Sequence, residues 1–254
     1  MKSRLILALA LACWAAPAAA QEKAAVKPGF AFPQDRPIRI LVFRPQVRVG
    51  AQSAGGVVSP NAEWTASARA NLQDALIAAK PGGAYEVVFM PELDGDNAAV
   101  LADYRALFNA VADTVLQHRL FKGDRLPTKK TGFEYSLGPG VARLGALGGG
   151  DYGLFLFSND AYGSTGRKLL QTFSILASVA SAGVSGAVIS VTSGEHVGYA
   201  GLVDLKTGDL VWMNADFRMG GDVREREGAT KRARELLSHF PGASNAAQAA
   251  TGAK

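Results

Sequence analysis

Glu195 and His196 are adjacent side chains that could serve as an acid and a base, and the serine-rich run Ser190 to Ser193 precedes them. In a hydrolase, the histidine would take the proton of a serine hydroxyl that attacks the substrate. No G-x-S-x-G elbow accompanies these residues, and neighbouring residues in a strand or turn point in different directions. The sequence therefore predicts no catalytic residue. An enzyme of unknown chemistry that uses Glu195 and His196 is the alternative.

Two further patterns contain side chains that bind metals. Asp94 to Asn97 offers oxygen ligands, but the distal glutamate and the longer spacing of a calcium loop are missing. We expect a turn whose side chains cap the next helix. The three histidines, His118, His196 and His239, share no metal-ligand spacing, and two of them fall near helix ends, where a partial negative charge favours them. No metal ligand is predicted.

Gly148, Gly150 and Gly153 match the G-x-G-x-x-G spacing of dinucleotide-binding loops. Such a loop must follow a strand and open a helix, so that the phosphates meet the helix N-terminus. Here the glycines lead into an apolar, strand-like run instead. We expect a flexible turn and no cofactor.

The elements that would position these residues alternate between strands and helices. Short apolar runs predict strands at 38–43, 85–90, 152–157 and 187–191. Apolar residues at helical spacing predict five helices. The first begins at the N-cap Ser59 with Pro60 and ends before Pro81, and the second carries the stripe from Val100 to Val115. The other three cover 141–147, 166–180 and 225–240.

A hairpin is the clearest local element. Residues 199–205 and 210–214 flank a turn in which Gly208 can adopt a positive φ. The fold class is therefore α/β (α+β), with a mixed central sheet, packed helices and a C-terminal β-hairpin followed by an amphipathic helix.

The segment from Leu169 to Gly194 contains no charged residue and has two interpretations. Its helical spacing favours a buried helix followed by a core strand. Its two-fold alternation would also suit a transmembrane β-hairpin contributed to an oligomeric pore. The alanine and serine content, which offers little apolar area to lipid, favours the first.

The first twenty residues resemble a bacterial secretory signal. A cationic start, an apolar run from Leu5 to Ala12 and small residues before Gln21 predict cleavage at residue 20 and a periplasmic protein. Cys13 is the single cysteine. If residues 10–13 were a lipobox, Cys13 would be lipidated and the protein would be an outer-membrane lipoprotein. Otherwise the mature chain has no thiol.

Composition limits the partners. Removing the signal takes away Lys2 and Arg4 and leaves a net charge of +3 instead of +5. This mild excess is scattered, whereas nucleic-acid surfaces concentrate basic charge on one face, so no nucleic acid is expected. The densest basic stretch, 224–234, alternates with glutamates, which predicts a solvated helix face with local ion pairs.

Four regions are expected along the chain: a signal peptide at 1–20, an extended lead-in at 21–36, a single α/β domain at 37–241 and a disordered tail at 242–254. The lead-in is rich in proline and lysine. The tail has no large apolar side chain to repay the entropy of ordering.

The hairpin from Ala200 to Trp212, Gly221 to Arg224 and the run from Leu236 to Pro241 resemble a group of uncharacterised exported proteobacterial proteins. The strand and helix order and the DLxTGxxxW hairpin resemble the envelope lipoproteins of the curli-secretion channel (CsgG-like) and the penicillin-binding-protein activators. This resemblance implies a non-enzymatic binding or assembly module of the cell envelope. It would contact an envelope protein, could form a homo-oligomer, and would touch the membrane only if Cys13 were lipidated.

Overall fold

The computed structural model describes residues 22–53, 55–79, 85–120, 126–129, 132–163 and 196–242. The signal peptide with Cys13, the ambiguous segment from Leu169 to Gly194, Glu195 and the tail after residue 242 lie outside the described residues, as do the helix expected at 166–180 and the strand expected at 187–191. None of the helices in these ranges combines the length and the apolar content needed to cross a membrane.

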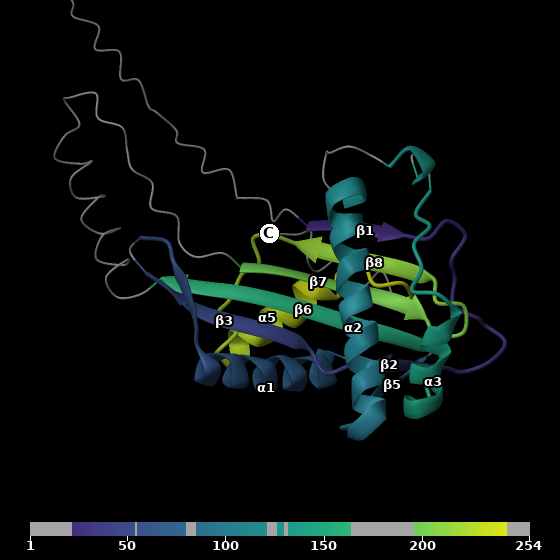
Figure 1. Ribbon diagram of the computed structural model, residues 1–254, viewed down its shortest axis with the longest axis horizontal. Helices are drawn as coiled ribbons and strands as arrows, with labels where there is room; N and C mark the ends of the chain where they lie inside the picture. The colour runs from purple at the N-terminus through teal and green to yellow at the C-terminus, as the bar shows by residue number, and fades with distance from the viewer. Residues whose placement is uncertain are drawn as a thin grey trace, which may run out of the picture.

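An eight-stranded mixed sheet forms the centre of the fold (Figure 1). Its main path runs β1-β8-β7-β6-β2-β5, while β3 pairs with the second half of β6 and with β4. The strands are β1 (Glu22–Val26), β2 (Ile38–Val42), β3 (Gln46–Gln52), β4 (Val58–Pro60), β5 (Tyr85–Phe89), β6 (Tyr152–Gly163), β7 (His196–Asp204) and β8 (Leu210–Asp216). Strand β2 is parallel to β5 and β6, whereas β6, β7, β8 and β1 are successively antiparallel. The expected mixed α/β class is confirmed.

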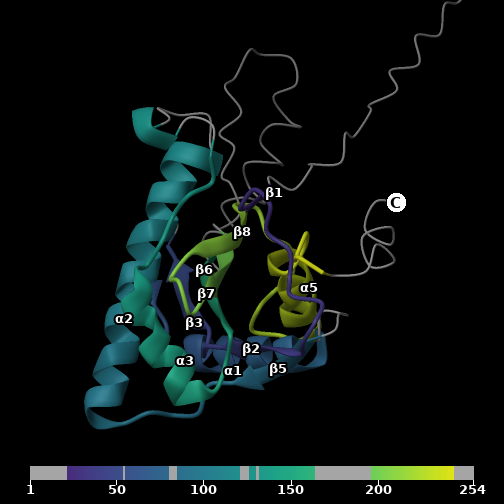
Figure 2. The same ribbon diagram turned by 90° about the vertical axis from the view of Figure 1, so that its right-hand side faces the viewer.

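Helices cover both faces of this sheet (Figure 2). They are α1 (Ala62–Ala79), α2 (Gly95–Val115), α3 (Ala142–Gly148) and α5 (Arg226–Leu236), and a π-helical turn, η1 (Leu116–Leu120), continues α2. Helices α1 and α5 pack on one face and α2 and α3 on the other. Because both faces of β2 are covered, its run is apolar at successive positions, with Ile40 and Val42 in one core and Leu41 in the other.

The chain departs from the expectations at its N-terminal side. Part of the expected lead-in is β1, which pairs with β8, and Phe32 packs in the core. Ser59 and Pro60 belong to β4 and do not cap a helix. Instead, the Asn61 side chain accepts a hydrogen bond of 2.9 Å from the Trp64 amide, as an N-cap does.

Two predicted turns have defined geometry. Asp94 is the N-cap of α2, but its side chain makes no capping hydrogen bond, contrary to expectation. Gly149, with φ +67°, ends α3, and the chain then enters β6. The glycines at 148–153 therefore form a helix-to-strand turn, the reverse of the order a dinucleotide loop requires.

Candidate functional site

A buried polar cluster lies between β6 and α5, and we call Ser158, Asp160, His196 and Arg232 the β6–α5 cluster. Alternation along β6 directs Leu154, Leu156, Ser158 and Asp160 to the face that α5 covers. Ser158, Asp160 and Arg232 are all fully buried. Charged groups at such depth are stable only when they are paired and hydrogen-bonded.

Arg232 supplies the positive charge of the cluster. Its Nη1 lies 2.8 Å from Oδ1 of Asp160 and donates to Oδ2 at 3.0 Å and to the Ser158 hydroxyl at 3.0 Å. Its other nitrogens donate to the carbonyl oxygens of Gly220 and Gly221. Arg232 was expected on a solvated helix face; this is wrong, because α5 turns that position toward the sheet. Lys231, next to it, is exposed and lies 3.8 Å from Glu235, as expected of a local pair.

His196 enters the cluster from the first position of β7, directly opposite Asp160 in the strand register. Its Nδ1 lies 2.8 Å from Oδ1 of Asp160. Since a carboxylate can only accept, Nδ1 carries a proton. Its Nε2 makes no hydrogen bond to a described residue, and the side chain is 22% exposed. A carboxylate-oriented imidazole with a free Nε2 can accept a proton from a bound molecule.

Aromatic side chains adjoin the cluster. The Tyr162 ring lies 4.9 Å from the His196 ring, and its hydroxyl accepts a hydrogen bond from the Val223 amide. Burial raises the pKa of Tyr162, so the phenol stays neutral. The Arg224 guanidinium lies between the Tyr162 and Trp64 rings, 3.9 and 4.3 Å from their centroids. These contacts hold β6, α1 and the loop before α5 together around His196.

The structure thus places His196 in a polar cluster, but with partners that the sequence did not indicate. Glu195 and Ser190 to Ser193 lie outside the described residues. The sequence did not single out Asp160, and it placed Arg232 on a solvated helix face. The alternation of β6 could have indicated Asp160, because Ser158 and Asp160 continue the inward-facing positions of a strand that was expected to end at residue 157.

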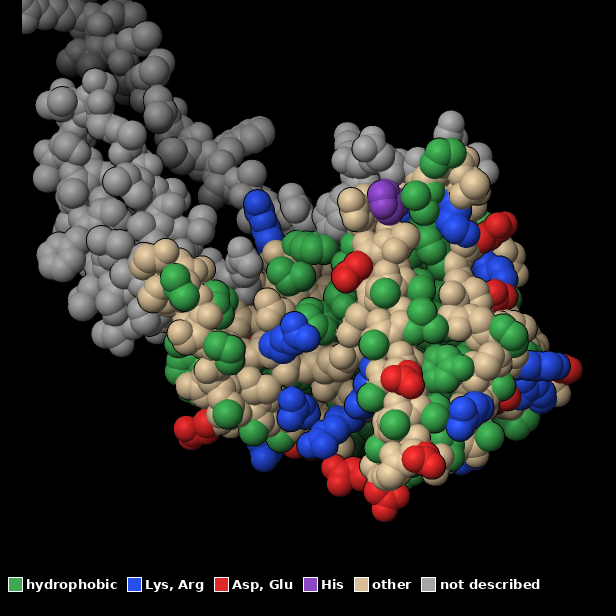
Figure 3. All heavy atoms as spheres, in the orientation of Figure 1, with side chains coloured by type: hydrophobic (Ala, Val, Ile, Leu, Met, Phe, Trp, Pro, Cys, Tyr) green, Lys and Arg blue, Asp and Glu red, His purple; other side chains and the backbone are tan. Residues whose placement is uncertain are grey.

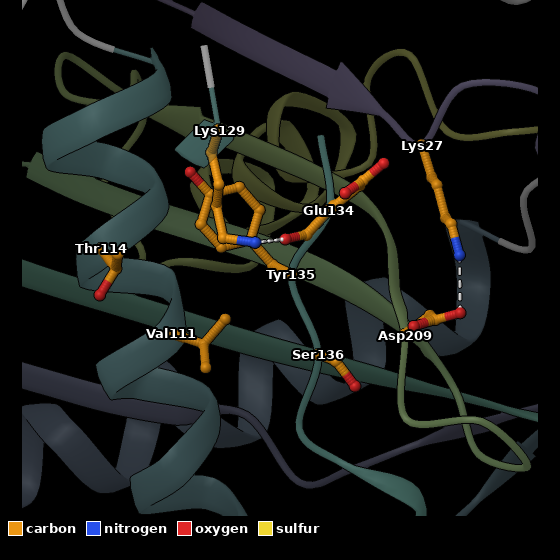
Figure 4. Close-up of a pocket in the computed structure, with 8 residues that line it drawn as sticks. All are labelled: Lys27, Val111, Thr114, Lys129, Glu134, Tyr135, Ser136 and Asp209. Atoms are coloured by element: carbon orange, nitrogen blue, oxygen red, sulfur yellow. Dashed lines mark hydrogen bonds and ion pairs between the residues drawn. The ribbon is translucent and has the colours of Figure 1, made fainter. Parts of the chain in front are cut away.

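A second feature is an open cavity of about 520 Å³ between α2 and the β1–β8 edge of the sheet (Figure 4). It is lined by Lys27, Val111, Thr114, Lys129, Glu134, Tyr135, Ser136 and Asp209. Lys27 follows β1, and Asp209 belongs to the turn between β7 and β8. The segment with Glu134 to Ser136 runs between them and α2, and Ser136 forms a bridge with Asp209.

The cavity carries charges of both signs. Nζ of Lys27 lies 2.6 Å from Oδ2 of Asp209, and both side chains are about one-third exposed. Nζ of Lys129 donates to the backbone oxygen of Glu134 and lies 5.0 Å from the centre of the Tyr135 ring. The Glu134 carboxylate has no hydrogen bond or ion pair with another described residue. It is therefore the charge in this cavity that a ligand could neutralise.

Within the described ranges, no three His, Cys, Asp or Glu side chains lie close enough together to hold a metal ion. His118 lies in the π-helical turn η1, and His239 follows the end of α5.

No family model matches the chain, and no curated protein matches it either. Two solved structures of the PelC dodecamer from Paraburkholderia phytofirmans are similar to it at a TM-score of 0.34. One is 15% identical and covers 85% of this chain and 91% of its own; the other, a point variant, is 14% identical and covers 88% and 99%.

Proposed function

We propose that this protein is a non-enzymatic binding or assembly module of the bacterial cell envelope that works in the periplasm through protein–protein contacts. The observation that supports this proposal is the cavity beside the β1–β8 edge, in which the Glu134 carboxylate makes no ion pair with another described residue. The secretory signal predicted at residues 1–20 supports the compartment.

The composition of the cavity favours a polypeptide partner. Its walls offer two lysines, two carboxylates and the hydroxyls of Thr114, Tyr135 and Ser136, with Val111 as an apolar contact. Peptide groups, which donate and accept hydrogen bonds in turn, match such a mixed surface. A basic side chain of the partner would complete the site by pairing with Glu134.

An edge strand adjoins this cavity. Among the described residues β1 pairs with β8 alone, so its outer edge is free to bind a further strand. Lys27 follows β1 directly, and its amide still donates to the Val211 carbonyl. An extended partner segment could therefore lie along β1 and direct a side chain into the cavity.

Site-specific crosslinking in intact cells tests the proposal. A photoreactive residue at exposed Ser136 should capture a defined envelope protein, or a second copy of this chain, whereas the same residue at exposed Ala66 on α1 should not. Capture at Ser136 should decrease when Glu134→Gln is added, because the carboxylate is lost while the shape is kept. Equal capture at both positions, or capture that ignores Glu134→Gln, would contradict the proposal.

The geometry of His196 favours a second candidate, an enzyme. The Asp160 carboxylate orients the imidazole, and Nε2 makes no hydrogen bond within the described part of the chain, which is the arrangement of a general base. However, Asp160 is shared with the fully buried Arg232, whose Nη1 lies 2.8 Å from Oδ1 of the same carboxylate. A buried carboxylate committed to an ion pair is better explained as a connection between β6 and α5.

A further inference from the structure

Strand β1 forms the first part of the sheet edge beside the cavity. It is antiparallel to β8 over its whole length, and the pairing continues at Lys27, whose amide donates to the Val211 carbonyl at 2.8 Å. Opposite residues of antiparallel strands exchange hydrogen bonds at every second position. Since Lys27 is such a position, Ala25 is another. The amide and carbonyl groups of Ala24 and Val26 therefore point away from β8, and no other described strand pairs with them.

A second segment continues this edge where β1 ends. The Leu210 amide of β8 donates to the Tyr135 carbonyl at 2.9 Å. The Leu137 amide donates to the Gly208 carbonyl at 2.8 Å. Ser136 lies between these two bonds, so its own amide and carbonyl point away from β8. We call β1 and this short segment together the composite edge.

Both segments lie on the same side of β8. Its other side pairs with β7, and there the Asp204 amide donates to the Asp209 carbonyl beside the turn. Strand β1 and the segment at Ser136 both run antiparallel to β8, so they follow each other in one direction along it. The cavity lies at their junction, because Lys27 and the residues from Glu134 to Ser136 line it (Figure 4).

Two side chains at the junction define what this edge would bind. Acidic and basic side chains lie close together on this part of the surface, to the right of α2 (Figure 3). Asp209 is paired with Lys27 at 2.6 Å, whereas the Glu134 carboxylate makes no ion pair with another described residue. On the opposite face of the sheet, Val26 lies beside Trp212 and is 43% exposed. The cavity face therefore favours a cation and the opposite face an apolar side chain.

We propose that the composite edge binds an antiparallel partner strand in which a basic residue adjoins an apolar one. This inference deepens the proposed function and rests on it. The partner's backbone would bond to Ala24, Val26 and Ser136, as in other complexes formed by strand addition. Neighbouring residues of a strand point to opposite faces. A basic side chain that enters the cavity toward Glu134 therefore places the next side chain against Val26.

Synthetic peptides test this pairing directly. The probe is a short peptide of alternating valine and threonine in which arginine replaces the central threonine, with both ends blocked and a fluorescein label. It should bind the mature protein saturably, as fluorescence anisotropy measures. Glutamine in place of the arginine should weaken the affinity about tenfold, the effect of losing a charged hydrogen bond. Glu134→Gln should weaken binding of the arginine peptide equally and leave binding of the glutamine peptide unchanged.

Methylation of the peptide's backbone nitrogens distinguishes strand pairing from a side-chain contact alone. The arginine would lie opposite a residue that bonds to β8, so its own amide points away from β1, whereas the amides of the two flanking valines point toward β1. Methylating both valine nitrogens should abolish binding, and methylating the arginine nitrogen should leave it nearly unchanged. Equal effects of the two modifications would overturn the proposal.

Variants at the exposed Ala24 test the same contact from the protein side. Ala24→Pro removes an amide that β8 does not use, so it should abolish peptide binding and keep the melting temperature within a few degrees of the natural chain. Ala24→Val keeps this amide and should bind the peptide like the natural chain. Binding that survives Ala24→Pro would contradict strand pairing.

The peptide assay and the crosslinking at Ser136 separate the two proposals. If no peptide binds while Ser136 still captures a partner that depends on Glu134, the composite edge is not a strand-binding site and the binding module remains. If peptides bind as expected but no partner is captured in cells, the edge pairs with strands and the proposed function is wrong.

Discussion

Arg232 and Asp160 form an ion pair in which both side chains are fully buried, with Nη1 2.8 Å from Oδ1. The two residues are 72 positions apart, on α5 and on β6. Removing charges from water costs several kcal/mol per ion, and the hydrogen bonds from Arg232 to Ser158 and to two backbone carbonyls offset this cost. The pair therefore fixes where α5 lies on the sheet.

Removing one partner of this pair should destabilise the fold strongly. Arg232→Met leaves the Asp160 carboxylate buried without its counter-charge, so we expect the free energy of unfolding to fall by about 3–5 kcal/mol. Urea unfolding followed by circular dichroism measures this. Arg234→Met, on the exposed side of the same helix, should change it by less than about 0.5 kcal/mol. Similar effects of both variants would refute the structural role assigned to the pair.

Gly208→Val should also destabilise the protein. Gly208 has φ +83°, as expected for the hairpin turn, and an added Cβ would overlap the Gly138 backbone. A β-branched residue at positive φ costs about 1–3 kcal/mol before any overlap is counted. Gly29→Val is the matched control, because Gly29 has φ +74° but open space around it. Thermal unfolding should give a larger loss for Gly208→Val than for Gly29→Val; equal losses would show that the overlap is relieved.

The elements that the sequence predicted well are those defined by local patterns. The apolar run of β2, the helical stripe of α1 and the hairpin of β7 and β8 lie where expected. Strand β3 was missed because Gly50 indicated a loop; the structure uses that glycine for close approach, since a Cβ there would meet Ser59 of β4. Strand β1 is short and rich in alanine, and its pairing with β8 is decided by tertiary context.

The site was harder to predict because its contacts depend on strand register. His196 was considered together with its sequence neighbours, whereas its hydrogen-bond partner Asp160 is 36 residues away. Only the pairing of β6 with β7 brings them opposite each other. The sequence does not distinguish Arg232 from the exposed charged residues around it. Its burial depends on which side of α5 faces the sheet.

Glu235 should make stability depend on pH. Burial is the main cause that raises its pKa above the ordinary value of 4.5, and the nearby Asp216 charge adds to the effect. In the unfolded chain this carboxyl ionises at a lower pH than in the folded protein, so the free energy of unfolding decreases as the pH rises through 4.5. This loss of stability persists at neutral pH. Glu235→Gln should therefore gain stability relative to the natural chain between about pH 4 and about pH 7.

Urea unfolding at both ends of this range measures the effect of Glu235→Gln. Glu227→Gln, at an exposed position in the first turn of α5, serves as the control and should show no such gain. A gain that is equal at both pH values would show that ionisation of Glu235 is not its cause.

The exported protein should begin at Gln21. The small residues before Gln21 fit signal peptidase better than residues 10–13 fit a lipobox, so the mature mass should lack an acyl group. Intact-mass spectrometry of the periplasmic fraction checks this. Palmitate labelling that disappears in Cys13→Ser would instead place the protein on a membrane.

Glu195 and His196 distinguish the binding module from the enzyme. If the protein acts through a surface, the double variant Glu195→Ala/His196→Ala should complement a deletion strain fully. Loss of a general base would lower a rate about 10²- to 10⁴-fold, which a growth or envelope phenotype would report. The variant should fold, because Asp160 keeps its bonds to Arg232 and Ser158 when the imidazole is removed.

Trp212→Ala provides the opposite control for that experiment. Trp212 is fully buried in β8, and its ring lies 5.1 Å from that of Phe240. Truncation should cost about 3–5 kcal/mol and abolish complementation through low abundance, which an immunoblot of the periplasm measures. If the Glu195/His196 double variant instead fails to complement at normal abundance, proton transfer by these residues is required, and the enzyme replaces the binding module.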